Sequence, residues 1–317
     1  MGKKKLKKGS KKKKPSKSIG NPPNFDRRAM EKTLSDITKL LDDHEFGSID
    51  EANAFLKDMF SSGATPSSSS PTPLKKAQDL MYDAWESSGK RRVELAYRAL
   101  EISKDCADAY ALLAEETARS LEEGKQLYEM AVKAGERALG PKAFKEDVGY
   151  FWGILETRPY MRARAGLAQS LWLLGEREQA IEHYREMLRL NPGDNQGIRY
   201  ILANCLLEEG LDEALGKLLN EYQGEVAAGW LYPHALWIFR REGASAKANA
   251  SLKKALKRNR FVPPYLLGAR RLPKHLPEYI GLGDESEAVA YAAEAIKGWQ
   301  KTPGALEWLG GRWVRFR

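Results

Sequence analysis

The sequence predicts an all-α protein built from helix pairs that repeat along the chain. Residues 161–219 hold one unit and most of a second copy, and in each a small or apolar pair precedes a turn glycine, Gly175 or Gly210, by eight residues. An alanine then opens each following helix, and these alanines, Ala180 and Ala214, lie 34 residues apart. Such a unit cannot bury its own apolar face, so we expect the units to stack on their neighbours.

The same pattern predicts about five pairs between residues 74 and 302. A turn at Gly89 divides the first pair, and a shorter turn divides the second, whose packing positions include Tyr128. The fifth pair reproduces the 34-residue spacing, since Leu252 follows Leu218 by that interval. A terminal helix is expected to begin after Asp284, and residues 310–317 are expected to fray at the end of the array.

The segments outside the repeats differ from them in composition. Residues 1–24 are Lys-rich and of low complexity, which predicts a disordered basic tail. Residues 25–60 show helical periodicity and predict a short helical pair, with Asp26 as the first cap and Ser48 with Glu51 as a capping box before the second. Residues 61–73 have the composition of a flexible Ser/Pro linker, and residues 74–317 form the repeat region.

An aromatic segment at residues 140–158 is predicted to interrupt the array as an irregular insert. It contains Phe144, Tyr150, Phe151 and Trp152, which we expect to pack on neighbouring helices because four aromatic side chains are too many to leave in water. Pro159 suits the first turn of the helix that follows, where its missing N–H is not needed.

The positive charge of the chain is confined to its first residues. Ten lysines between Lys3 and Lys17, with no acidic residue among them, exceed the net charge of +9 and leave a body of about −1. Such a segment can bind polyanions without base specificity, or serve in nuclear import, or simply solubilise the chain. The tail residues expected to contact a polyanion are Lys3, Lys4, Lys5, Lys7, Lys8, Lys11, Lys12, Lys13 and Lys14.

The sequence carries no pattern typical of a catalytic or metal site. Its four histidines are dispersed, without the spacing of a zinc site, and Cys106 and Cys205 fall in helical patterns rather than in a disulfide framework. We therefore expect a protein that is not an enzyme and binds no cofactor or metal. The absence of an apolar leader or a long apolar run predicts a cytoplasmic protein, or a nuclear one if the basic tail is an import signal.

A binding surface is expected on the first helices of the central pairs. Because Leu167 and Leu171 lie at the buried spacing, Arg162, Gln169 and Trp172 fall on a different stripe of the same helix. Amides suit a partner's main chain, arginine suits a carboxylate, and aromatic rings supply apolar anchors. The predicted peptide-binding groove comprises Arg158, Arg162, Gln169, Trp172, Gln196, Arg199, Tyr200 and Asn204. The alternative is that these arginines, together with Arg164, form structural ion pairs with Glu156, Glu182, Glu208 or Glu209, and that Trp172 is buried.

Taken together, the 34-residue period, the turn glycines and the opening alanines resemble the tetratricopeptide repeat (TPR). That resemblance implies a right-handed helical solenoid and a role in protein–protein interaction. A second resemblance rests on ALEISKDCADAYALLAEE and on TRPYMRARAGLAQSLWLLGEREQAIEHYREMLRLNPGDNQGIRY. These stretches look like those of repeat proteins grouped with the suppressor-of-tumorigenicity-seven family, which implies no established activity.

The sequence thus favours a scaffold or adaptor that holds a segment of a protein partner in the concave groove of a TPR-like solenoid. The alternative is a nucleic-acid or ribonucleoprotein factor held to a polyanion by its Lys-rich tail.

Overall fold

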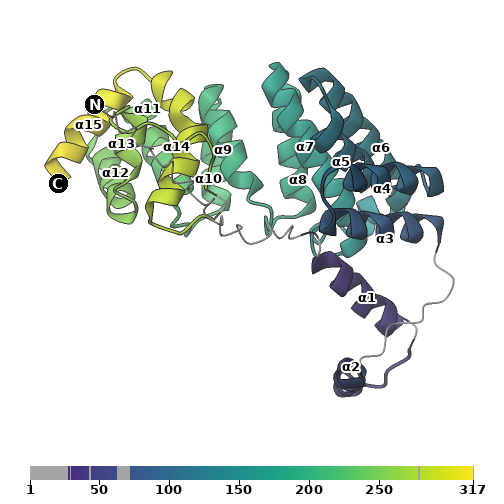
Figure 1. Cartoon of the computed structure of the whole chain (residues 1–317). Helices are drawn as coiled ribbons and strands as arrows, with labels where there is room; N and C mark the ends of the chain where they lie inside the picture. Colours follow the sequence, from purple (N-terminus) through teal and green to yellow (C-terminus); the bar gives the residue numbers. More distant parts are fainter. Residues whose placement is uncertain (1–27, 29, 43, 63–71, 278, 317) are drawn as a thin grey trace, which may run out of the picture.

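A computed structural model describes residues 28, 30–42, 44–62, 72–277 and 279–316 (Figure 1). Within these ranges every regular element is a helix, so the predicted all-α class is confirmed for the described part of the chain. No helix among these residues is both long and apolar enough to span a bilayer. The predicted Lys-rich tail and most of the predicted Ser/Pro linker lie outside the described residues.

Ten helices form five consecutive pairs, and each helix packs on the next along the chain (Figure 1). The pairs are α3 (Pro73–Glu86) with α4 (Gly89–Ile102), α5 (Ala107–Thr117) with α6 (Leu121–Glu146), α7 (Arg158–Leu174) with α8 (Arg177–Leu190), α9 (Ile198–Glu208) with α10 (Asp212–Glu221), and α11 (Ala228–Glu242) with α12 (Ala246–Arg258). Stacked pairs of this kind bury a continuous core, which here contains Ala180, Tyr184 and Leu252.

The glycines expected in the turns between paired helices adopt the backbone that the turns require. Gly175 and Gly210 have φ angles of 86° and 72°, in the left-handed region that residues with a Cβ rarely enter. A different glycine allows close packing between pairs, since a Cβ on Gly166 of α7 would lie 2.1 Å from Cε1 of Tyr128. The Tyr128 ring of α6 therefore lies directly on the α7 backbone.

Six further helical elements flank or connect the pairs: α1 (Met30–Asp42), α2 (Ile49–Ser62), η2 (Leu155–Thr157), α13 (Val262–Leu266), α14 (Glu285–Gln300) and α15 (Ala305–Phe316). As predicted, α14 begins after Asp284, whose side chain accepts hydrogen bonds from the Ser286 and Glu287 amides. The expected fraying of the last residues is not seen up to Phe316, because α15 packs on α12 and α13.

The segment at residues 140–158 is more regular than predicted. Helix α6 continues to Glu146 across a break at Gly140, where φ is 68°, so the first part of the segment is helical. Phe144 and Phe151 pack against each other and against Tyr160, as expected for buried aromatics. Tyr150 departs from the expectation, since it is 73% exposed.

Candidate partner-binding groove

Among the first helices of the pairs, α5 packs on both α3 and α7, and α11 packs on α9. The chain itself covers part of each group. Helix α1 is connected to α3 and α7 by ion pairs with Asp83 and Arg162, and Arg28, just before α1, pairs with Glu115 of α5. Helix α14 returns from the far end of the chain to pack on α9 and α11. A Cβ on Gly298 of α14 would lie 3.3 Å from Cβ of Leu207, so α14 and α9 approach closely. An open stretch remains between α1 and α14.

The end covered by α1 is centred on Arg162. This guanidinium contacts both oxygens of Glu31 through Nη1 at 2.9 Å, and donates to Asp108 from Nε at 2.8 Å and from Nη2 at 2.6 Å. Arg158 also reaches Glu31, at 3.3 Å. The Arg162 guanidinium lies 5.0 Å from the centroid of the Trp85 ring. Two of the predicted groove residues are thus occupied by a carboxylate from the chain's own α1.

The surroundings of Arg162 keep it charged. Its burial acts to lower the pKa of the guanidinium, but the carboxylates of Asp108 and Glu31 outweigh this effect and raise the pKa above its ordinary value. Asp108 is itself 2% exposed. Arg162 and Asp108 thus belong to a buried, hydrogen-bonded ion cluster. Truncating one member of such a pair lowers the stability of the fold strongly, because the other charge is left buried and unpaired.

The open stretch between α1 and α14 is a groove of about 500 Å³. We call it the middle groove, and its lining includes Gln169, Trp172 and Leu173 of α7, Gln196 before α9, Asn204 of α9, and Glu294 of α14. Five of the eight predicted groove residues line it, namely Arg162, Gln169, Trp172, Gln196 and Asn204.

The middle groove is rich in hydrogen-bond acceptors. Asn204 is 8% exposed, and its Nδ2 donates to Oε2 of Glu294 at 3.3 Å. The other side-chain atom of this amide, Oδ1, and the Oε1 of Gln196 are buried without a hydrogen-bond partner among the described residues. Buried acceptors are normally paired, so these two oxygens are exceptions among the described residues of the groove.

Glu294 stands open to the middle groove, yet protein surrounds it on several sides. This partial burial raises the pKa of its carboxyl, although the hydrogen bond from Asn204 acts in the opposite direction. Glu115 and Glu208 also line the groove, where the cationic groups are Arg162, already held by two carboxylates, and Lys297. The lining therefore favours a ligand that carries N–H donors.

Trp172 is half-buried and forms a wall of the middle groove. Arg177 stacks on it with the guanidinium carbon 3.8 Å from the ring centroid, and Nη1 of Arg177 donates to the Trp172 carbonyl at 2.7 Å. This cation–π contact fixes the ring, so the indole presents a rigid apolar edge rather than a mobile side chain.

Arg199 and Tyr200 are not part of the middle groove. Arg199 pairs with Asp194 at 2.9 Å and with Glu225 at 2.7 Å, while the Tyr200 hydroxyl donates to Glu225 at 2.7 Å. Burial, with a contribution from the hydrogen bond to Glu225, raises the pKa of Tyr200 to about 12. Both side chains connect the turn before α9 to the loop before α11. The structural ion pairs considered as the alternative exist for Arg158, Arg162 and Arg199, but their partners are not the expected glutamates.

Several residues of this surface were not predicted from the sequence, namely Glu31, Asp108, Leu173 and Glu294. Asp108 had a local signal, because it is an acidic residue within the apolar run ADAYALLA, and a buried acid needs a partner. Glu31 and Glu294 had none, since their positions depend on helices that fold back from distant parts of the chain.

The two cysteines are buried within helical packing. Burial raises the pKa of the Cys106 thiol to about 12 and that of Cys205 well above its usual range, so both are protonated at neutral pH. Their environment is that of packing residues.

Comparison with known proteins relates the chain to one family. The sequence profile of the family described as "ST7 protein" matches residues 68–147, which span α3 to α6. The chain is similar to suppressor of tumorigenicity 7 proteins. It is 30% identical over 263 residues to the human "Suppressor of tumorigenicity 7 protein-like", a match that covers 76% of this chain and 46% of the relative.

Two other relatives give similar values. The chicken (Gallus gallus) "Suppressor of tumorigenicity 7 protein-like" is 28% identical over 271 residues, with 76% of this chain and 47% of the relative covered. "Protein ST7 homolog" of Drosophila melanogaster is 29% identical over 265 residues, with 75% and 49% covered. The chain thus spans about half the length of the curated relatives it matches. The resemblance to suppressor-of-tumorigenicity-seven proteins that was drawn from the sequence is supported.

Proposed function

We propose that the chain is a protein–protein interaction scaffold whose middle groove binds a short segment of a partner protein. The observation that carries this proposal is the pair of buried, unpartnered oxygens of Gln196 and Asn204 in an open groove. Beside them Trp172 and Leu173 supply apolar surface, and Leu173 is 57% exposed. An extended segment offers main-chain N–H groups to such acceptors and an apolar side chain to such a wall.

The proposal includes the architecture that the repeat pattern implies. We take the five pairs as a right-handed, TPR-like solenoid whose concave face is formed by the first helices. Because α1 and α14 cover the two ends of that face, the partner segment should be short.

A display selection tests this function. Peptides of twelve residues selected on the full-length chain are titrated against the wild type, against the double variant Gln169→Ala, Asn204→Ala, and against Arg189→Ala on α8 as a control away from the groove. We expect the double variant to bind at least tenfold more weakly, which corresponds to about 1.4 kcal/mol, the scale of one or two hydrogen bonds. Equal affinity for wild type and double variant, with unchanged circular dichroism, would refute the proposal.

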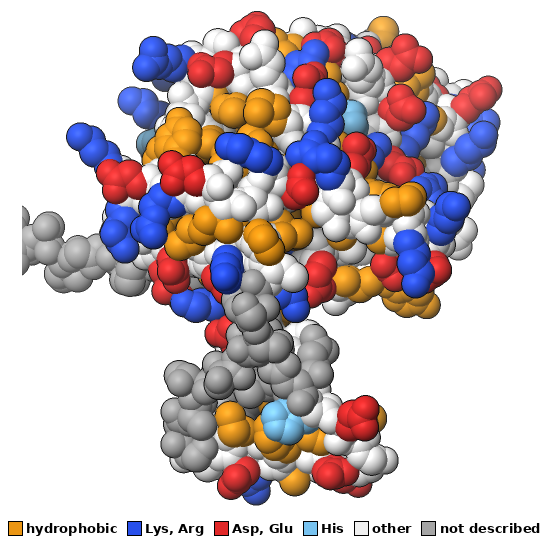
Figure 2. Space-filling view, turned by 90° about the vertical axis from the view of Figure 1, so that its right-hand side faces the viewer, with side chains coloured by type: hydrophobic (Ala, Val, Ile, Leu, Met, Phe, Trp, Pro, Cys, Tyr) orange, Lys and Arg blue, Asp and Glu red, His pale blue; other side chains and the backbone are white. Residues whose placement is uncertain are grey.

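The second proposal, polyanion binding through the Lys-rich segment, rests on the sequence. The described body offers it little support, because basic and acidic side chains are interspersed over the face in Figure 2 and no broad basic patch is seen there. Removing residues 1–20 should abolish salt-dependent binding to a heparin column or to duplex DNA, while leaving the binding of selected peptides unchanged. Retention of the same salt slope after the truncation would exclude this role.

A further inference from the structure

Charged side chains connect helix α1 to the first three pairs. Glu31 contacts Arg158 and Arg162, Lys32 contacts Asp83 at 3.0 Å, and Arg28, just before the helix, contacts Glu115 at 3.2 Å. Glu31 is 7% exposed, whereas the apolar Leu34 of the same helix is 45% exposed. The helix thus buries a carboxylate, a group that proteins rarely bury unless it is paired with a cation.

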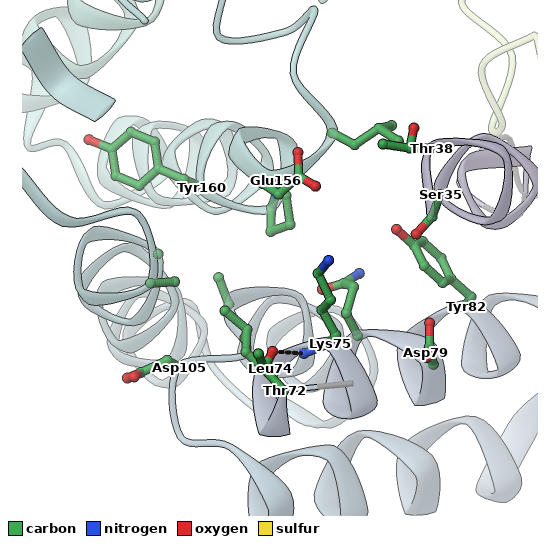
Figure 3. A pocket seen from close by; sticks show the side chains of 16 residues that line it. Ser35, Thr38, Thr72, Leu74, Lys75, Asp79, Tyr82, Asp105, Glu156 and Tyr160 are labelled. Carbon is green, nitrogen blue, oxygen red and sulfur yellow. Dashed lines mark hydrogen bonds between the residues drawn. The ribbon is translucent and has the colours of Figure 1, made fainter. Parts of the chain in front are cut away.

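The packing beneath α1 is also incomplete. A crevice of about 180 Å³ separates it from α3, α6 and α7, and Figure 3 shows Ser35 and Thr38 of α1 facing Lys75 and Glu156 across it. Protein interiors contain few voids larger than a water molecule, so α1 is not packed as an interior helix.

The receiving site does not depend on α1 for its shape. Asp108 holds Arg162 through two hydrogen bonds, and the Trp152 carbonyl accepts from Nε of Arg158 at 2.9 Å. The Trp152 ring lies 5.4 Å from the Arg158 guanidinium, just as Trp85 lies near Arg162. Two oriented guanidinium groups would therefore remain after Glu31 left. Because Asp108 neutralises only one of their two charges, the pair forms a site for a carboxylate.

We propose that Arg158 and Arg162 form a recognition site for a helical segment of a partner protein that carries a glutamate between basic residues, and that Glu31 of α1 fills this site in the isolated chain. The proposal extends the scaffold function to a second contact beside the middle groove, but it does not depend on what binds there.

The contacts of α1 define the chemistry of the partner segment. Its glutamate enters the arginine pair, a basic residue three positions earlier reaches Glu115, and another directly after it reaches Asp83, as Arg28 and Lys32 do. A partner segment that presents a glutamate in this basic setting can therefore replace α1. Displacement of α1 would then join the arginine pair to the middle groove, since Glu115 and Arg162 line that groove.

The test uses a fluorescein-labelled synthetic peptide of residues 26–42, which carries the α1 contacts, and two full-length proteins. One is the wild type and the other is the variant Arg28→Ala, Glu31→Ala, Lys32→Ala, in which α1 loses its contacts. We expect the peptide to bind the variant at least tenfold more tightly than the wild type, because the wild-type site is already filled. A peptide with Glu31→Gln should bind the variant at least tenfold more weakly than the parent peptide.

Two further proteins locate the site. Arg158→Ala added to the triple variant should weaken peptide binding at least fivefold, whereas Gln169→Ala with Asn204→Ala should leave it unchanged, which separates this site from the middle groove. If the triple variant were poorly folded, the single variant Glu31→Gln would take its place. Equal binding of the parent peptide to wild type and variant, or equal binding of the Glu31→Gln peptide, would overturn the proposal.

Discussion

Arg162 is a nearly buried charged residue with several charged and aromatic neighbours on this surface. Its guanidinium is surrounded by Asp108, Glu31 and Trp85, and its side chain is 13% exposed. A residue so placed serves folding first, so its substitution does not isolate ligand binding. Gln169 and Asn204 are better probes of the middle groove, since neither is held in a buried ion cluster.

Truncation of this arginine should be costly. In Arg162→Ala, Asp108 remains a buried carboxylate without its main partner, and we expect the free energy of unfolding to fall by about 3–5 kcal/mol. Urea denaturation followed by circular dichroism measures the loss. Arg189→Ala removes an exposed pair with Glu186 and should cost less than about 1 kcal/mol. A similar small effect at both positions would show that the ion cluster at Arg162 does not stabilise the fold more than an exposed ion pair does.

A second residue-scale prediction concerns His183 and pH. Burial, aided by the charge of Arg164, lowers the pKa of His183 to about 4, and its Nδ1 has no hydrogen-bond partner. Because the folded pKa lies below the ordinary value of about 6.5, the folded state resists protonation. The stabilising contribution is complete above about pH 6.5 and is lost as the pH falls towards 4.

The variant His183→Gln, which does not titrate, isolates this contribution from that of the carboxylates. Between pH 7 and pH 4.5 the free energy of unfolding should fall further in the wild type than in the variant. Parallel pH dependence of the two proteins in urea denaturation would contradict the assignment.

At the scale of elements, α1 and α14 cover the same kind of surface by different means. Helix α1 and the residue before it use ion pairs, two of which are partly exposed, whereas α14 buries Tyr291, Trp299 and several alanines. Charge attraction is screened by salt and apolar burial is not, which predicts different responses of the two helices.

Raising the salt concentration should release α1 and not α14. The Debye length falls from about 10 Å at 0.1 M salt to about 3 Å at 1 M, which weakens the exposed pairs of Arg28 and Lys32. Hydrogen–deuterium exchange with mass spectrometry should then show faster exchange over residues 30–42 and unchanged exchange over residues 285–300. Unchanged exchange in α1, or an equal rise in both helices, would show that α1 is docked as firmly as α14.

Element by element, the sequence predicted what depends on local patterns. The turn glycines Gly175 and Gly210, the buried alanine Ala180 and the start of α14 after Asp284 all follow from spacing and capping within a few residues. The ion pairs of Arg158, Arg162 and Arg199 were open as an alternative, but the partners expected from the sequence were wrong. That information is not local, since Glu31 lies 131 residues from Arg162 and Asn204 lies 90 residues from Glu294.

At the scale of the whole molecule, stacked helix pairs present a long surface, and two helices of the same chain shorten the part open to a partner. Five of the eight residues proposed from the repeat pattern line the middle groove. The repeat pattern could not predict that α1 and α14 cover the ends of this surface, because both helices lie outside the repeating units. The account therefore predicts a short ligand with N–H donors.

The most direct measurement of this central claim is photo-crosslinking of the selected peptides to the full-length chain. A benzoylphenylalanine is placed either at Leu173, which is 57% exposed and lines the middle groove, or at Tyr97 of α4, which is 52% exposed and does not line it. The account predicts adducts at position 173 that disappear when excess unlabelled peptide is added, and none at position 97. Equal adducts at both positions, or adducts at 173 that unlabelled peptide does not suppress, would contradict it.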